Sequence, residues 1–94
     1  MAQKLRTRII EAENLFTDAM ELVGYFNISI SGDGWEGTVT AQRSFDGGST
    51  WYDVASWTAN TQEYGFEPER VVHYRVGVKL AEFGSGSINV RLSQ

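Results

Sequence analysis

The chain has 94 residues, 41% of them hydrophobic, a size that fits one domain and leaves no room for a second core. It contains no cysteine, which excludes disulfides and thiolate metal sites. The formal net charge is −4 and the basic residues are scattered from Lys4 to Arg91, so we expect no nucleic-acid partner.

Residues 1–20 are predicted to form an amino-terminal arm or an edge strand, ahead of a β-sandwich domain over residues 21–94. Residues 5–10 suit an edge strand, whereas residues 14–22 contain enough Leu, Ala, Met and Glu for a helical turn. We favour a strand followed by a loop. The basic start leads into Glu-rich sequence, and apolar runs fall short of the roughly 18–20 residues that cross a bilayer. We therefore expect no signal peptide, no membrane partner and synthesis in the cytoplasm.

Alternation of apolar and polar residues predicts the next strands. Residues 22–31 alternate and then stop at the Gly32-Asp33-Gly34 turn, and β-branched residues favour a return strand over residues 37–45. These two segments are predicted to form a hairpin. Residues 51–58 supply a further strand.

The carboxy-terminal third contains the clearest strand pattern. Residues 59–70 lose the alternation and are predicted to be a long connection. Residues 72–80 alternate from Val72 to Leu80, and residues 88–92 repeat the pattern, so the two are predicted to form a hairpin. Several short strands and no helical pattern predict an all-β, single-domain antiparallel two-sheet β-sandwich, either jelly-roll or immunoglobulin-like.

One local motif is specific. Residues 44–51 match the Ser-x-Asp-x-Gly-x-Thr-Trp pattern, so the segment resembles the Asp-box hairpin of sialidase-like propellers. The predicted turn residues are Ser44, Asp46, Gly47, Gly48, Thr50 and Trp51. Asp46 can accept hydrogen bonds from amides two residues on, the glycines tolerate positive φ, and Trp51 is expected to anchor the returning strand in the core. The motif occurs once in a chain too short for a propeller, and it predicts a structural role.

The sequence contains no motif that supports a catalytic function. The carboxylates are not paired by any motif, and the only histidine, His73, is expected on the polar face of a strand. Tyr74 belongs to a Tyr-x-Val pattern that resembles fibronectin-like sandwiches, where a buried hydroxyl ties down the preceding connection. We expect no catalytic, cofactor-binding or metal-binding residues.

Four residues are predicted to contact partners. Trp35 lies in a turn-rich stretch, where its ring is either exposed to a partner or folded back over the edge of the sandwich. Tyr25 is a second candidate. Arg6 and Arg8 belong to the amino-terminal arm, which is expected to lie along neighbouring subunits.

Residues 24–32, 37–48 and 85–93 resemble segments of small structural proteins of tailed bacteriophages, and the resemblance covers roughly residues 20–94. It implies a non-enzymatic virion protein, and our preferred hypothesis is a capsid decoration or cement subunit. Such a protein would bind the major capsid protein or other virion proteins and form a homo-oligomer, a dimer or a trimer.

Two alternatives remain open. Within the same class, the protein is a tail, neck or fibre-adaptor subunit. In a different class, it is a carbohydrate-binding β-sandwich module, because sugars stack on exposed rings and the chain has Trp35, Trp51 and Trp57.

Overall fold

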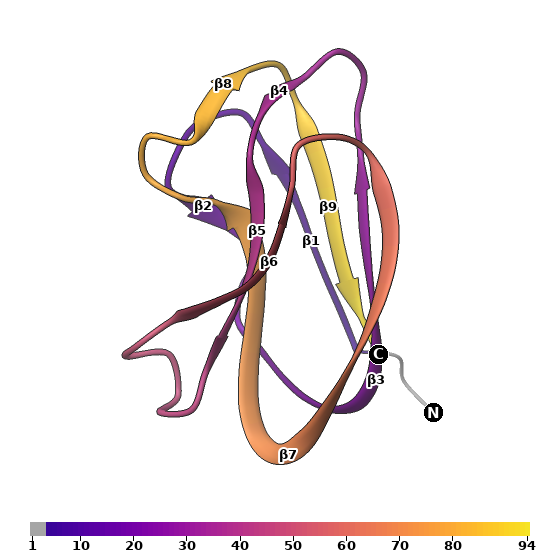
Figure 1. The fold of residues 1–94 in the computed structure, drawn as a ribbon, viewed down its shortest axis with the longest axis vertical. Coiled ribbons are helices and arrows are strands. Elements are labelled where there is room, and N and C mark those ends of the chain that lie inside the picture. The colour runs from indigo at the N-terminus through magenta and orange to yellow at the C-terminus, as the bar shows by residue number, and fades with distance from the viewer. Residues whose placement is uncertain (1–3) are drawn as a thin grey trace.

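The computed structural model describes residues 4–94, and all of its regular structure is β. Every strand pair is antiparallel, which confirms the prediction of an all-β antiparallel protein. The strands are β1 (Leu5–Ile10), β2 (Leu15–Phe16), β3 (Met20–Ser31), β4 (Glu36–Gly37), β5 (Val39–Ser44), β6 (Tyr52–Trp57), β7 (Thr61–Val78), β8 (Phe83–Ser85) and β9 (Ile88–Ser93). Figure 1 shows their arrangement.

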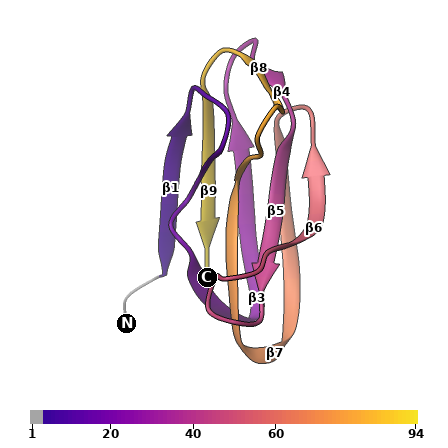
Figure 2. The same ribbon diagram turned by 90° about the vertical axis from the view of Figure 1, so that its left-hand side faces the viewer.

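Seven strands form one sheet in the order β1-β9-β3-β7-β5-β6, with β2 added to β7. Strands β4 and β8 form a separate two-stranded sheet. Strands β1 and β6 are the two edges of the main sheet, and Figure 2 shows them on opposite sides of the molecule.

Both predicted hairpins, residues 22–31 with 37–45 and residues 72–80 with 88–92, are wrong. Strand β3 pairs with β7 and β9, and not with β5, while β9 lies between β1 and β3, and not beside β7. A turn signal shows that the chain reverses, but it does not decide which strands become neighbours. Because β9 has a neighbouring strand on each side, the side chains of Ile88, Val90 and Leu92 are buried.

Residues 59–70 are mostly strand, which corrects the predicted long connection. Residues 61–67 of β7 pair with residues 24–30 of β3, and residues 73–77 pair with β5. Between these halves the register with β3 shifts, and Val71 adopts a φ of 62°. Residues 72–74 pair again with residues 20–22 of β3, so β7 stays beside β3 beyond the register shift and gains β5 as a second neighbour.

The sequence did not predict a strand over the first half of β7, because polar residues there face the core and apolar residues face solvent. Thr61, Glu63 and Gly65 lie opposite Ile30, Ile28 and Phe26, which are buried. Directly opposite side chains share a face of the sheet, so the polar positions of this segment face inward. Its aromatic positions face outward, which is the reverse of an ordinary amphipathic strand.

The ends of the chain differ from prediction in smaller ways. Strand β1 matches the expected edge strand, but residues 14–22 contain the short strand β2 and the start of β3. Ile10 is fully buried, so the predicted arm contributes to the core, and residues 1–3 of that arm lie outside the described residues. Strand β7 ends at Val78, so Leu80 is exposed and not on the core face as expected.

The core is assembled from strands β1, β3, β5, β7 and β9 together with the ring of Trp35. Most of its side chains are aliphatic and β-branched, which pack well on a pleated surface. Its fully buried aliphatic members are Ile10, Leu22, Ile30, Val39, Val72, Val76, Val78, Ile88 and Leu92.

Candidate binding surface

Three exposed aromatic side chains, Tyr25, Tyr64 and Phe66, form what we call the outer aromatic patch. Their relative exposures are 70%, 75% and 56%. The Tyr25 ring centroid lies 4.9 Å from that of Phe66, edge to face, and 6.4 Å from that of Tyr64. Large rings usually lose most of their exposure on folding, so three of them gathered in solvent form a candidate contact surface.

The pairing of β3 with β7 builds this patch. Tyr25 lies directly opposite Phe66, and Asn27 lies directly opposite Tyr64. Tyr25 was a predicted partner contact, whereas Tyr64 and Phe66 were missed because they fall in the predicted connection. The inverted alternation of residues 61–67 was the signal that would have found them.

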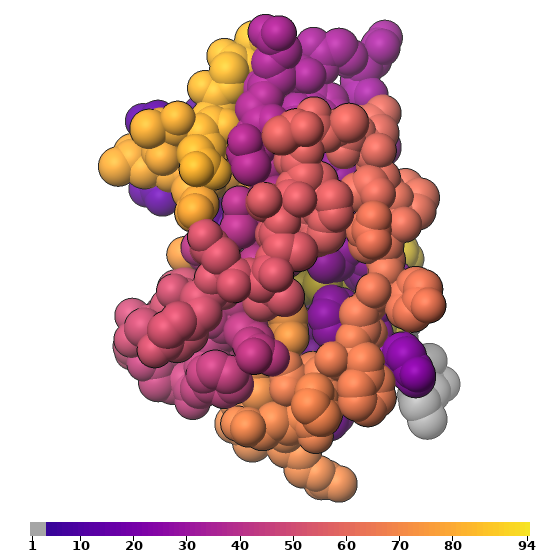
Figure 3. All heavy atoms as spheres, in the orientation of Figure 1, coloured from indigo at the N-terminus to yellow at the C-terminus, as the bar shows by residue number. Residues whose placement is uncertain are grey.

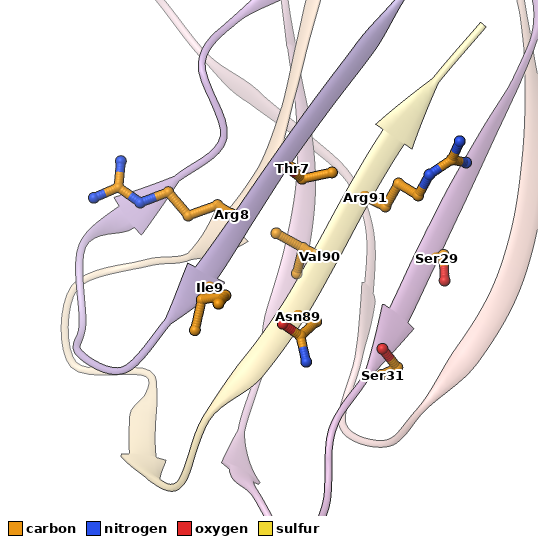
Figure 4. A pocket seen from close by; sticks show the side chains of 8 residues that line it. All are labelled: Thr7, Arg8, Ile9, Ser29, Ser31, Asn89, Val90 and Arg91. Carbon is orange, nitrogen blue, oxygen red and sulfur yellow. The ribbon is translucent and has the colours of Figure 1, made fainter.

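The same outward face becomes polar toward β1. A shallow hollow of about 420 Å³ lies over β1, β9 and β3, lined by Thr7, Arg8, Ile9, Ser29, Ser31, Asn89, Val90 and Arg91. Figure 4 shows the side chains of Arg8 and Arg91 pointing away from each other. Arg8 donates to the carbonyl of Phe16 at 3.4 Å and Arg91 to Ser93 Oγ at 2.9 Å. The two guanidinium groups therefore do not converge on one anion.

Arg6 and Arg8, both predicted partner contacts, lie on the exposed part of β1. Arg6 donates only to the carbonyl of Leu5, its sequence neighbour, among the hydrogen bonds of residues 4–94. Neither arginine forms an ion pair within the described chain. Their charges are thus available to a partner.

Trp35, a predicted partner contact, is only 9% exposed. Its indole Nε1 donates to Asn60 Oδ1 at 2.8 Å, and Asn60 in turn donates to the carbonyl of Gly32 at 2.8 Å. A Cβ at Gly32 or Gly86 would lie within 3.0 Å of Trp35. Of the two alternatives for this ring, the structure has the folded-back one.

The Asp46 carboxylate organises the turn between β5 and β6. Its Oδ1 accepts hydrogen bonds from the Ser44 hydroxyl at 2.6 Å and from the amides of Ser49 and Thr50 at 3.1 and 2.9 Å. The bonds from Ser44 and Thr50 lower the pKa of Asp46 to about 2. These amides lie three and four residues on, and not two as expected.

The other turn residues also close this loop. Gly47 and Gly48 have φ values of 75° and 105°, and the Gly48 amide donates to Ser44 Oγ at 2.8 Å. Trp51 is half-buried, and the Arg75 guanidinium lies 4.3 Å from its ring centroid. The expectation that Trp51 packs in the core is wrong, because its ring is not part of the core cluster. It packs instead against the Arg75 guanidinium, which also contacts the ring of Phe16.

A buried carboxylate holds the bend in β7. Glu67 is 1% exposed and accepts hydrogen bonds from the Tyr74 hydroxyl at 2.7 Å, from Arg43 at 2.8 Å and from the Glu69 amide at 3.0 Å. Burial alone would raise the pKa of Glu67, but these donors hold it below its usual range. Tyr74 is buried as predicted, and burial together with Glu67 raises its pKa to about 12. This cluster is structural, since every charge has its partner.

Within residues 4–94, no group of three or more acidic or histidine side chains is placed to hold a metal ion. The described chain also contains no helix long and apolar enough to cross a membrane. No protein-family model matches the chain, and neither does any curated protein or solved structure.

Proposed function

We propose that the protein acts by binding other proteins and not by catalysis, as a structural subunit of a virion. The observation that carries this proposal is the outer aromatic patch. Tyrosine and other large rings dominate the energetics of protein–protein contacts when they are shielded from water in a partner's pocket. Tyr25, Tyr64 and Phe66 lie on a continuously paired part of β3 and β7, which supports such a role.

We propose further that the main sheet folds into an open two-layer β-sandwich. One layer would contain β1, β9, β3 and the first half of β7, and the other would contain the second half of β7 with β5 and β6. The interruption of the β3 pairing at residues 68–71, and the pairing of residues 73–77 with β5, support this reading. A rigid module of this kind suits repeated contacts on a particle surface.

The preferred location is the capsid exterior, as a decoration or cement subunit bound to the major capsid protein. Support comes from the resemblance to small phage structural proteins and from the exposed rings, which would be buried at joints between shell subunits. Many copies would multiply a modest interface. The alternative within the class is a tail, neck or fibre-adaptor subunit.

The test uses intact particles and then purified components. Mass spectrometry measures the copy number of the chain per particle, and immunogold labelling locates it. Many copies over the head are expected, a few copies at one vertex would instead indicate a neck or tail part, and absence from particles would contradict the proposal.

A binding measurement tests the role of the patch. In binding of purified protein to undecorated shells, we expect Tyr25→Ser/Tyr64→Ser to weaken affinity by about tenfold or more, because two hot-spot rings are lost. The matched control is Phe45→Ser/Tyr52→Ser, which removes another exposed aromatic pair, with centroids 6.1 Å apart, at the opposite end of β5 and β6 from Trp57. Equal losses in both variants would show that the patch has no special role.

Two of the three tryptophans that motivated the carbohydrate-binding alternative do not offer an open ring face for a sugar to stack on. Trp35 is buried, and the guanidinium of Arg75 covers Trp51. Trp57 is half-buried and remains. A glycan panel read by tryptophan fluorescence tests this alternative, for which we expect no change in emission.

A further inference from the structure

An open seam lies between β6 and the first half of β7. In the described chain, β6 has β5 as its one hydrogen-bonded neighbour, and residues 61–67 of β7 have β3 as theirs. The two strands diverge from their connecting turn, and Figure 3 shows the surface hollowed between them, with atoms of deeper strands visible. The main sheet is therefore not closed at this point.

A cavity of about 220 Å³ occupies the seam. Small residues leave the space, namely Ala41, Ala55 and Gly65, and the rings of Phe26, Trp57 and Tyr74 also line it. A Cβ at Gly65 would lie 2.7 Å from the Phe26 ring, so this glycine keeps the backbone close to the aromatic wall. The result is an apolar recess with aromatic sides.

Glu63 is the one carboxylate among the residues that line this recess. It lies on the inner side of the sheet, opposite the buried Ile28, but at the open seam its side chain remains exposed. Its Oε2 accepts a hydrogen bond from the Thr61 hydroxyl at 2.7 Å, and it forms no ion pair within residues 4–94. An inward charge at a free sheet edge disfavours addition of another strand, so the seam suits a single cationic side chain better than a whole strand.

The chain itself carries the complementary charge. Lys4, Arg6 and Arg8 are three of its 8 basic residues, and residues 1–8 contain no acidic residue. The remaining chain therefore has 8 − 3 = 5 basic and 12 acidic residues, a net charge of 5 − 12 = −7. The basic strand β1 lies at the edge of the sheet opposite β6, so it cannot reach the seam of its own copy.

We propose that an arginine of β1, Arg6 or Arg8, from a second copy of this chain inserts into the seam beside Glu63. The guanidinium would pair with the Glu63 carboxylate while its stem packs against Trp57 and Phe26, where cation–π attraction adds to the ion pair. Such a contact joins two different surfaces, so it is heterologous and propagates into a ring or a chain of subunits. This inference goes beyond the proposed function and does not depend on a virion location.

Sedimentation velocity of the purified protein at low salt tests the contact. We expect the average mass of the wild type to rise with concentration and to fall as salt is added. Glu63→Lys and Arg6→Glu/Arg8→Glu should each weaken association by about tenfold or more. A wild type that stays monomeric at all concentrations would overturn the proposal.

Mixing the two variants gives the decisive result. The Glu63→Lys copy retains its arginines and the Arg6→Glu/Arg8→Glu copy retains its seam, so the mixture should associate although neither variant does alone. The reversed charges of the two copies are also complementary, so both kinds of contact can form in the mixture. Glu69→Lys and Arg70→Glu are the matched controls, because they reverse exposed charges on β7 that do not line the cavity, and they should associate like the wild type. Failure of the mixture to associate, or equal losses in the controls, would overturn the proposal.

Discussion

Glu67 shows how this small protein keeps a charge inside. Its carboxylate receives three donors, from a tyrosine hydroxyl, a guanidinium and a backbone amide. A buried carboxylate is tolerated only when its oxygens are satisfied in this way. Because Arg43 and Tyr74 come from β5 and the second half of β7, Glu67 connects both sides of the bend.

Stability should therefore depend on pH through Glu67. Its pKa in the folded state lies below the ordinary 4.5, so its contribution is complete at neutral pH and is lost as the pH falls below 4.5 and through the folded-state value. We expect Glu67→Gln to lower the free energy of unfolding at pH 7 by about 1–2 kcal/mol, since Arg43 can turn to solvent. Urea denaturation at several pH values measures this. A variant that retains the full acid dependence of the wild type would contradict the assignment.

The charge of Asp46 is stabilised by the turn between β5 and β6, and this should be visible in its titration. In a carboxyl NMR titration, Asp46 should titrate near its pKa of about 2, because hydrogen bonds from Ser44 and Thr50 stabilise its charged form. Ser44→Ala removes the largest of these contributions, so the Asp46 midpoint should move up toward its ordinary value of 3.8. Ser49→Ala serves as the control, because Ser49 contributes only through its backbone amide and should leave the midpoint in place.

At the scale of elements, the bend of β7 places a β-branched residue in an unfavourable conformation. Val71 has a φ of 62° and an exposed side chain. Branched side chains clash with the backbone in this left-handed region, whereas glycine does not. The strain is local, and it lies at the point where the register between β7 and β3 shifts.

We expect Val71→Gly to raise the free energy of unfolding by about 1 kcal/mol, because it relieves this strain at little loss of packing. Ile9→Gly is the matched control: Ile9 is also exposed and β-branched, but it lies in the regularly paired strand β1 and has no positive φ, so glycine should destabilise there. Chemical denaturation of both variants checks the opposite signs. If both changes destabilise, Val71 is not strained.

Alternation predicted the strands whose apolar side chains face the core, such as β9 and the second half of β7. It failed for residues 61–67, because Tyr64 and Phe66 face solvent while Glu63 lies on the inner side of the sheet. The same inversion hid most of the aromatic patch and the seam. Strand neighbours were not predictable either, since β1 and β9 are distant in sequence and local turn chemistry carries no information about their contact.

For the whole molecule, strands β1 and β9 contribute unequally to the core. Strand β1 buries only Ile10 of its six residues, whereas β9 buries Ile88, Val90 and Leu92 between two neighbours. Burial of those three side chains is worth about 5–9 kcal/mol. That range is comparable to the total stability of roughly 5–10 kcal/mol expected for a domain of this size.

A pair of truncations tests this difference. A chain of residues 1–86, which lacks β9, should be unfolded, and a chain of residues 10–94, which keeps Ile10, should fold. Circular dichroism and the dispersion of amide proton NMR signals distinguish the two states. A folded 1–86 chain would contradict the central role of β9.

The position of β9 also orders events during synthesis. Strand β1 pairs with β9, and β3 lies between β9 and β7, so the first strands to leave the ribosome wait for partners that are translated last. A local hairpin can form as it emerges, but the sheet between β1 and β3 cannot close until residues 88–93 are free of the exit tunnel. Folding of this chain is therefore completed after translation of its last strand, and its early strands are exposed to chaperones and proteases until then.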